Sequence, residues 1–339
     1  MRYIEITQLE KPVSVIGLGA ATRAFTPDMY DRAAELLDRF LAAGGNCVDS
    51  ANIYGFGDSE KTLGRWIQES GRRREIVLIT KGCHPTVNRE DILGSPWVSR
   101  LTPEAIQTDL SESLERLHTD FIDLYLLHRD DEAVSVGPII EELNQQQARG
   151  YIRAFGASNW RVERIAEANQ FAAQHGLNGF VISSPSLSLA HPKKMLFPGT
   201  LFADEGTRQW HHKNQYPLLA WSALATGFMS GKFKPDDLSN EDVVQVYYSE
   251  ENFERLHRAQ ELAARKNVTV AQIGLGFVLQ QAFPVIALVG STTVSNLDDA
   301  LGALNVELNL DEMEYLDLLP HPRPFSLWEK GVPSPTGES

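Results

Sequence analysis

The chain has 339 residues, of which 42% are hydrophobic and 22% charged, and its formal net charge is −14. This balance is that of an ordinary globular protein with enough apolar material for a sizeable core. The negative charge argues against nucleic acid and against an anionic lipid surface as partners, because both bind clustered Lys and Arg. Length alone allows one large domain or two.

Two cysteines, Cys47 and Cys83, are too few for a disulfide scaffold in a chain of this length. We expect both to be reduced thiols in a cytoplasmic protein. The first five residues lack the apolar stretch of a signal peptide. The longest weakly polar run, residues 218–229, is too short to span a bilayer.

Strand-like and helix-like segments alternate along the chain. Short apolar runs predict strands at 13–16, 46–48, 75–80, 121–127, 151–156, 179–182, 216–221 and 285–289. One-sided apolar patterns predict helices at 30–43, 139–149, 160–175, 251–265, 270–281, 294–303 and 311–318. Thr102 and Pro103 open a further helix. About eight strands, each followed by a helix or a long loop, are the number that a (β/α)₈ TIM barrel requires.

No linker rich in Pro, Gly or Ser divides the chain. We therefore expect one α/β domain, a barrel over residues 1–320, followed by an irregular tail at 321–339. Three segments exceed the usual length of a connection, at 82–101, 187–202 and 230–249. All three follow expected strands, so they would form long loops on the C-terminal face of the barrel.

Four reactive side chains lie at or near the ends of expected strands. Asp49, Lys81 and His128 each end a short apolar run, and Tyr54 lies in the loop after the first of these runs. In a parallel barrel these strand ends open onto one face, so the four residues would converge. Each alone has an ordinary structural explanation, such as a helix cap, a surface charge or a core histidine. Their common position favours catalysis.

The four side chains suit proton transfer to a carbonyl group. The phenol of Tyr54 has an ordinary pKa of about 10, so it needs a neighbouring cation that favours the phenolate. Lys81 would supply that cation, and Asp49 would hold Lys81 charged and in place. His128 would orient the substrate oxygen. Such a general acid requires a hydride donor, and nicotinamide is the usual one.

The chain resembles an aldo-keto reductase over nearly its whole length. The motifs that carry the resemblance are residues 49–55 (DSANIYG), 80–81 (TK), 123–128 (DLYLLH), 152–159 (IRAFGASN), 220–224 (AWSAL) with Gly227, Gly231 and Lys232, and 290–292 (GST) with Asn296 and Asp299. Together these motifs are specific, whereas any one alone is not.

The resemblance implies NAD(P)H-dependent interconversion of an aldehyde or ketone and an alcohol, with Asp49, Tyr54, Lys81 and His128 as catalytic residues. A small carbonyl compound or a sugar-like compound would be the substrate, and no metal is implied. The implied cofactor-binding residues are Gly19, Ala20, Asp49, Ser158, Asn159, Ser184, Trp221, Ser222, Leu224, Gly227, Lys232, Gly290, Ser291, Thr292, Asn296 and Asp299.

The chain departs from the family pattern at both ends of the expected cofactor site. Ser184 stands where the family often has glutamine, Leu187 where it often has tyrosine, and Thr292 where arginine is frequent. No Lys or Arg occurs from residue 284 through 322, so this segment offers no cation for a 2′-phosphate. NADP is the expectation from the family, and NAD stays open.

Other interpretations are weaker. The glycines of residues 16–20 suggest a Rossmann fingerprint, but Thr22 takes the third glycine position and Pro27 precedes the helix. His211 and His212 are adjacent, so on a helix they would point apart and not share a metal. A nicotinamide-binding redox-sensing subunit and a sugar-modifying enzyme that uses the nicotinamide transiently both remain as alternatives. The pocket lining also stays open; its candidates are Ile53, Trp97, Phe197 and Phe202.

Overall fold

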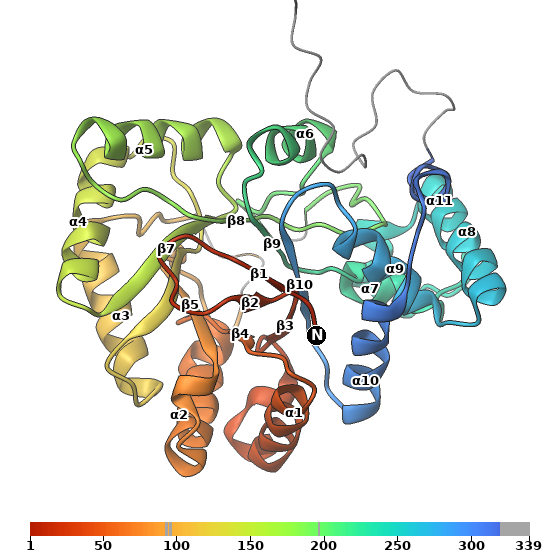
Figure 1. Cartoon of the computed structure of the whole chain (residues 1–339), viewed down its shortest axis with the longest axis horizontal. Coiled ribbons are helices and arrows are strands. Elements are labelled where there is room, and N and C mark those ends of the chain that lie inside the picture. Colours follow the sequence, from red (N-terminus) through yellow and green to blue (C-terminus); the bar gives the residue numbers. More distant parts are fainter. Residues whose placement is uncertain (92–93, 95–96, 196, 319–339) are drawn as a thin grey trace, which may run out of the picture.

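A computed structural model describes residues 1–91, 94, 97–195 and 197–318. Eight parallel strands close into a barrel in the order β10-β3-β4-β5-β6-β7-β8-β9, and helices surround it (Figure 1). The predicted (β/α)₈ TIM barrel is therefore confirmed. The predicted tail at 321–339 lies outside the described residues, so its irregularity and the domain boundary at 320 remain predictions.

The barrel strands are short and mostly buried. They are β3 (Ile16–Gly19), β4 (Cys47–Asp49), β5 (Val77–Gly82), β6 (Ile122–Leu127), β7 (Ile152–Ser158), β8 (Ser183–Ser184), β9 (Leu218–Ala220) and β10 (Val285–Val289). A hairpin of β1 (Tyr3–Ile4) and β2 (Val13–Ser14) precedes them.

The helices are α1 (Tyr30–Ala42), α2 (Asp58–Ser70), α3 (Pro103–Arg116), α4 (Val136–Ala148), α5 (Val162–Gln174), α6 (Glu205–Asn214), α7 (Glu241–Tyr247), α8 (Glu250–Lys266), α9 (Val270–Leu279), α10 (Val294–Gly302) and α11 (Leu310–Leu316). The predicted helix start at Thr102 is confirmed, because the Thr102 side chain accepts a hydrogen bond from the amide of Ala105.

Strand β5 shows why the apolar runs are continuous. Val77 and Ile79 belong to the cluster inside the barrel, whereas Ile76 and Leu78 belong to the layer between strands and helices. Both faces are therefore buried, as expected for a parallel sheet covered by helices. The inner cluster also contains Ile6 and Val13 from the N-terminal hairpin, which closes one end of the barrel.

The sequence-based boundaries were wrong at three strands. The strand expected at 13–16 spans two elements, because Val13–Ser14 form β2 of the N-terminal hairpin and the barrel strand β3 begins at Ile16. The strand expected at 75–80 begins at Val77, because residues 73–75 form a 3₁₀ turn. The strand expected at 179–182 is instead β8, whose Ser183 and Ser184 pair with β7. Backbone pairing fixes this strand, and its serines give no apolar signal.

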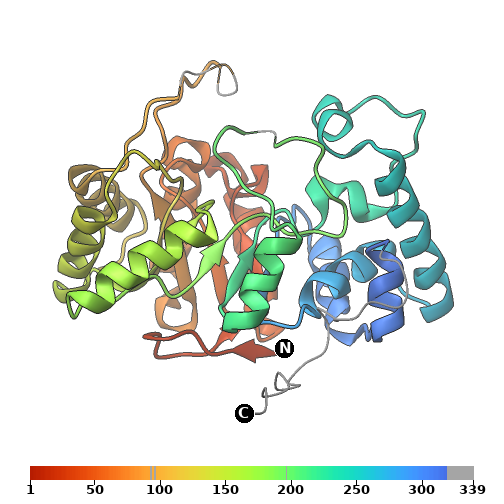
Figure 2. The ribbon, with the colours of Figure 1, turned by 90° about the horizontal axis from the view of Figure 1, so that it is seen from above.

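The long segments after β5, β8 and β9 rise, in their described parts, from the same end of the barrel, opposite the N-terminal hairpin (Figure 2). The segment at 230–249 is only partly a loop, because it contains α7. Within the described part of the chain, no helix combines the length and apolar character needed to cross a membrane. Cys47 and Cys83 are both buried and free.

Candidate functional site

The barrel brings the four predicted catalytic residues together. Asp49 is the last residue of β4, Lys81 lies near the end of β5, and His128 directly follows β6. Tyr54 begins a 3₁₀ segment, residues 54–57, in the connection after β4. Because β4, β5 and β6 are neighbours in the sheet, their carboxyl ends place these side chains side by side.

Lys81 is the centre of the group. Its Nζ donates hydrogen bonds to Oδ1 and Oδ2 of Asp49 at 2.6 and 2.7 Å, to the backbone oxygen of Ser50 at 2.9 Å, and to Oη of Tyr54 at 3.2 Å. The side chains of Lys81 and Asp49 are 2% and 3% exposed. An ammonium group is therefore held, away from solvent, against a phenol.

His128 completes the group from the other side of Tyr54. The two rings meet edge to face with their centroids 5.7 Å apart. The ring of His84, which sequence analysis missed, packs in the same way on His128 at 4.8 Å. Among the described residues, Nδ1 of His128 has no hydrogen-bond partner although it is buried. This nitrogen is available to a ligand.

Burial sets the protonation states of these groups. Burial raises the pKa of Tyr54, and the opposing effect of Lys81 is smaller. Lys81 favours the phenolate, as expected, but desolvation outweighs the cation, so the pKa of this phenol lies above its usual value. Burial alone would lower the pKa of Lys81, but Asp49 and Tyr54 together raise it.

Burial also lowers the pKa of His128 well below its usual value, assisted by the positive charge of Arg129. Near neutral pH the site therefore contains a protonated phenol, an ammonium group and a neutral imidazole. This combination can donate a proton from Tyr54 to an acceptor oxygen, and it can stabilise the phenolate that remains.

A second layer of buried polar residues orders the connection that carries Tyr54. Glu60, in α2, accepts a hydrogen bond from Oγ1 of Thr80 at 2.6 Å and forms an ion pair with Arg116 at 3.3 Å. Arg116 also donates to the backbone oxygen of Asn52 at 3.3 Å. This layer could not be predicted from the sequence, because α2 gave no clear helical pattern and nothing in the sequence shows that Glu60 is buried.

Most of the candidate cofactor-binding residues occupy the remaining strand ends. The catalytic group takes the ends of β4, β5 and β6, and most candidates lie at or just after the ends of β7, β8, β9, β10 and β3. Asn296 and Asp299 lie instead within α10, and Lys232 follows the 3₁₀ segment after β9. Whether these candidates bind a cofactor stays a prediction.

The candidates after β7 and β8 contact one another. Ser158 Oγ donates to the backbone oxygen of Ser184 at 3.0 Å, and Asn159 Nδ2 donates to Ser158 Oγ at 3.0 Å and to the backbone oxygen of His128 at 3.2 Å. Oγ of Ser184 is buried and has no partner among the described residues. This small polar group is free to meet a ligand.

The candidates after β9 lie on an unusually shaped segment. Ser222, Thr226 and Gly227 have positive φ angles of 52°, 53° and 87°. Nε1 of Trp221 is buried, with no acceptor in the described part of the structure. Leu224 is half-buried and Lys232 is exposed. Turns of this kind can gather successive backbone N–H groups into an anion-binding concavity.

The candidates after β10 lead into a helix. Gly290, Ser291 and Thr292 connect β10 to α10, whose first turn is capped by Thr293 through the amide of Asn296 at 3.2 Å. A helix N-terminus favours anionic ligands such as phosphate. Asp299 instead accepts hydrogen bonds within the protein, from Thr269 at 2.8 Å and from Gln272 at 2.9 Å.

Gly19 ends β3, the neighbour of β10, and Ala20 directly follows it. The amide of Ala20 donates to the backbone oxygen of Asp49 at 2.8 Å, which ties this candidate to the catalytic group. A Cβ atom on Gly290 would lie 3.0 Å from Cγ2 of Thr22, so the two strand ends approach closely.

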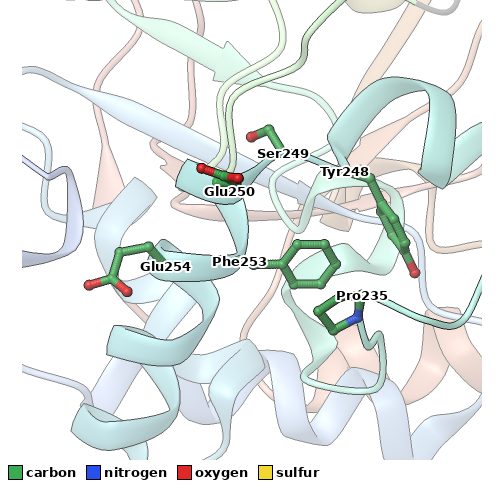
Figure 3. A pocket seen from close by; sticks show the side chains of 6 residues that line it. All are labelled: Pro235, Tyr248, Ser249, Glu250, Phe253 and Glu254. Carbon is green, nitrogen blue, oxygen red and sulfur yellow. The ribbon is translucent and has the colours of Figure 1, made fainter.

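A depression of about 540 Å³ lies elsewhere, at the start of α8 (Figure 3). Its lining residues are Pro235, Tyr248, Ser249, Glu250, Phe253 and Glu254. None of them is a predicted site residue. The described residues contain no cluster of three or more His, Cys, Asp or Glu side chains able to hold a metal ion. His211 instead forms a hydrogen bond through Nδ1 with the backbone oxygen of Tyr216 at 2.7 Å.

Comparison with known proteins shows the family of the chain. The family model of the aldo/keto reductase family matches residues 15–319. Norsolorinic acid reductase stcV of Emericella nidulans is 31% identical over 89% of this chain and 76% of its own length. The aldo-keto reductase yakc of Schizosaccharomyces pombe, whose name specifies NADP(+), is 29% identical over 77% of this chain and 74% of its own length.

A third relative is aryl-alcohol dehydrogenase GME11368 of Pestalotiopsis microspora, which is 26% identical over 89% of this chain and 74% of its own length. The family model covers most of the barrel, and the three relatives are all named as oxidoreductases. The chain belongs to the aldo/keto reductase family and is an oxidoreductase.

Proposed function

We propose that this protein reduces an aldehyde or ketone to an alcohol, or catalyses the reverse reaction, with NADP(H) as cofactor. The observation that carries the proposal is the position of the Lys81 ammonium group. It lies 3.2 Å from Oη of Tyr54 and is held there by both carboxylate oxygens of Asp49. A phenol with a fixed cation at its oxygen is suited to give up a proton and take it back.

Tyr54 acts as the general acid in the direction of reduction. Its raised pKa keeps the phenol protonated at neutral pH, so the proton is present when a carbonyl oxygen arrives. As the proton leaves, Lys81 stabilises the phenolate by charge and by a hydrogen bond. Asp49 fixes Lys81 in position. His128, neutral and with a free Nδ1, orients the carbonyl oxygen.

The residues around the face fit a nicotinamide cofactor. Buried polar atoms without partners in the described structure, on Ser184 and Trp221, indicate a ligand beside β8 and β9. Ser158, Asn159 and Ser184 would hold the nicotinamide end. The segment 222–227 and the start of α10 would hold phosphates. When bound, the reduced cofactor supplies a hydride to the carbonyl carbon.

Two observations bear on the choice of cofactor. The name of the fission yeast relative specifies NADP(+), which supports NADP here. The segment after β10 has no Lys or Arg, so a 2′-phosphate would need a cation from another segment. Lys232 is exposed on the segment that follows β9 and is our candidate for that contact. NAD is the alternative if Lys232 makes no difference.

The relatives and the loop tips support a small, partly aromatic substrate. Two of the relatives above are named for norsolorinic acid and for aryl alcohols. Trp97 and Phe197, on the loops after β5 and β8, are 43% and 41% exposed. We infer a cytoplasmic location from the two free thiols, because such thiols are typical of a reducing compartment. The net charge of −14 disfavours nucleic acid as a partner.

Turnover of a neutral aromatic aldehyde separates the candidate functions. The protein is incubated with NADPH and 4-nitrobenzaldehyde, and the nicotinamide absorbance and the alcohol product are followed together. A reductase consumes one NADPH for each alcohol formed. A redox-sensing subunit binds NADPH without consuming it, and a sugar-modifying enzyme that uses the nicotinamide transiently shows no net consumption. Either of those results contradicts the proposal.

A further inference from the structure

Arg129 is a buried cation beside the catalytic group. It directly follows His128 and is 6% exposed. Its Nη1 donates to the backbone oxygen of His128 at 2.8 Å, and its Nε donates to the backbone oxygen of Pro198 at 3.3 Å. No carboxylate of a described residue lies within ion-pair distance of its guanidinium group. Two neutral carbonyl groups are its partners.

The other two arginines that the described structure buries have a carboxylate nearby. Arg208 pairs with Asp317 at 2.9 Å. Arg255 forms no direct ion pair with a described residue, but the charges of Asp317 and Glu251 raise its pKa against the larger effect of burial. No carboxylate of a described residue does so for Arg129. A buried charge without a counter-ion is expensive, because desolvation is not repaid by an opposite charge. Burial accordingly lowers the pKa of Arg129 to about 10, so the group still carries its positive charge at neutral pH. An incoming anion would remove this unfavourable state.

Arg129 lies beside the residues that we assign to catalysis. It is close enough to Tyr54 for each to affect the pKa of the other, and it also affects His128 and His84. Its hydrogen bond to the backbone oxygen of His128 fixes the cation beside a residue of the catalytic group.

The two long loops meet next to this cation. Pro198 accepts the hydrogen bond from Arg129, and a Cβ atom on the neighbouring Gly199 would lie 2.3 Å from the ring of Trp97. The loop after β8 is therefore fixed between the guanidinium group on one side and an exposed indole on the other. A substrate held here would meet a positive charge and an aromatic surface together.

We propose that Arg129 binds an anionic group of the carbonyl substrate, a carboxylate or a phosphate, and so determines substrate class. The planar guanidinium group forms paired hydrogen bonds with either anion, which a neutral ester or hydroxyl group cannot replace. The inference rests on the proposed function for the carbonyl chemistry. It adds that the physiological substrate is a charged aldehyde or ketone.

The kinetic test uses matched substrates. The kcat/KM for 4-carboxybenzaldehyde is compared with that for its neutral methyl ester, and glyceraldehyde 3-phosphate is compared with glyceraldehyde. The native protein should prefer at least one anionic member by about 10- to 100-fold, the range expected for hydrogen bonds to a charged group. Preference within the first pair assigns a carboxylate, and preference within the second assigns a phosphate.

Substitution of the cation should abolish this preference. In Arg129→Met the anionic and neutral members should have similar kcat/KM values, with the loss mainly in KM, and Arg129→Lys should retain part of the preference. Arg161→Met is the matched control, because the side chain of Arg161 is 65% exposed and pairs only weakly, at 3.9 Å. The control should keep the preference of the native protein. Native protein that treats all pairs equally overturns the inference, although 4-nitrobenzaldehyde turnover would still support the proposed function.

A binding test works even if no aldehyde is turned over. Benzoate and phenyl phosphate are titrated into the native protein and into Arg129→Met by calorimetry, with thermal unfolding measured in parallel. At least one anion should bind the native protein and raise its Tm, and neither should do so for the variant. Without an anion, Arg129→Met should unfold at or above the native temperature, because an uncompensated buried charge is removed. Equal binding by both proteins, or none by the native protein, contradicts the role of Arg129.

Discussion

The Nζ atom of Lys81 lies 2.6 Å from Oδ1 of Asp49, and neither side chain is more than 3% exposed. Two adjacent strands, β4 and β5, hold this ion pair at the end of the barrel. The same ammonium group contacts the phenol that we assign as the general acid. We therefore expect stability and the proposed catalysis both to depend on this one buried pair.

Removal of the Asp49 carboxylate should lower both the stability and the activity of the protein. Asp49→Asn leaves the Lys81 ammonium group buried without its counter-ion, which typically costs about 3–5 kcal/mol of stability. Urea unfolding measures the loss, and aldehyde turnover should fall as well. Asp298→Asn is the control, since Asp298 pairs with Arg39 at 2.7 Å with both side chains well exposed. Surface pairs contribute only about 0–1 kcal/mol, so similar losses in the two variants would refute this account.

Buried histidines should make the protein sensitive to acid. Burial lowers the pKa of His211 from its usual 6.5 to about 4. Between these values the unfolded chain binds a proton that the folded protein does not, so stability falls as pH decreases from about 6.5 to 4. This shift in the pKa of His211 corresponds to about 3 kcal/mol of unfolding free energy.

His211→Gln should therefore flatten the dependence of unfolding free energy on pH across this interval. His257→Gln, at a side chain that is 63% exposed, provides the comparison. Urea unfolding at several pH values between 4 and 7 measures the slope. An unchanged slope in His211→Gln would show that another group is responsible.

Gly57 should not tolerate a side chain, because of its backbone conformation and because of the atoms around it. Its φ angle is 95°, and a Cβ atom there would lie 2.9 Å from the guanidinium group of Arg116. Gly57→Ala should therefore displace Arg116. An alanine in the left-handed conformation alone costs roughly 1–2 kcal/mol of stability, and we expect a larger loss here. The variant should also have a lower kcat, because the connection that carries Tyr54 is disturbed. Gly71→Ala is a matched control, because Gly71 has φ 68° and nothing within 4 Å of the added atom. Unfolding and turnover are measured for both variants, and equal effects would exclude a special role for Gly57.

Lys232 should distinguish the two nicotinamide cofactors. If its ammonium group contacts the 2′-phosphate, Lys232→Ala should raise KM for NADPH and leave KM for NADH unchanged. The expected increase is about tenfold, the lower end of what a hydrogen bond to a charged group contributes. Lys234, also exposed and only two residues away, supplies the control as Lys234→Ala. Parallel effects on both cofactors would assign Lys232 to a phosphate that they share.

The sequence was sufficient to predict the barrel and the convergence of Asp49, Tyr54, Lys81 and His128, whose catalytic role stays a prediction. Apolar runs at β5, β6 and β10 identify strands buried on both faces, and a reactive residue at the end of such a strand has a predictable position. Helix α2 was missed because buried polar residues such as Glu60 and Thr62 interrupt its apolar side. Strand β8 was misplaced because its two serines pair through the backbone.

Burial of charge was the property that the sequence could not provide. Arg129 looks like any surface arginine until the loop after β8 covers it, and its missing counter-ion is visible only in three dimensions. The upward shift of the Tyr54 pKa likewise depends on burial. Spacing along the chain predicts that Lys81 lies near the phenol, but the larger effect of desolvation depends on everything packed around both groups.

The measurement that tests the central claim most directly is hydride transfer in Tyr54→Phe. NADPH binding is measured by fluorescence, and consumption of NADPH with 4-nitrobenzaldehyde is followed in the same samples, with Tyr151→Phe, at an exposed tyrosine, as control. Tyr54→Phe should bind NADPH like the native protein but turn over the aldehyde about 10²–10⁴ times more slowly, the usual contribution of a general acid. Turnover within a few-fold of the native rate, with NADPH still bound, would contradict the assignment of Tyr54.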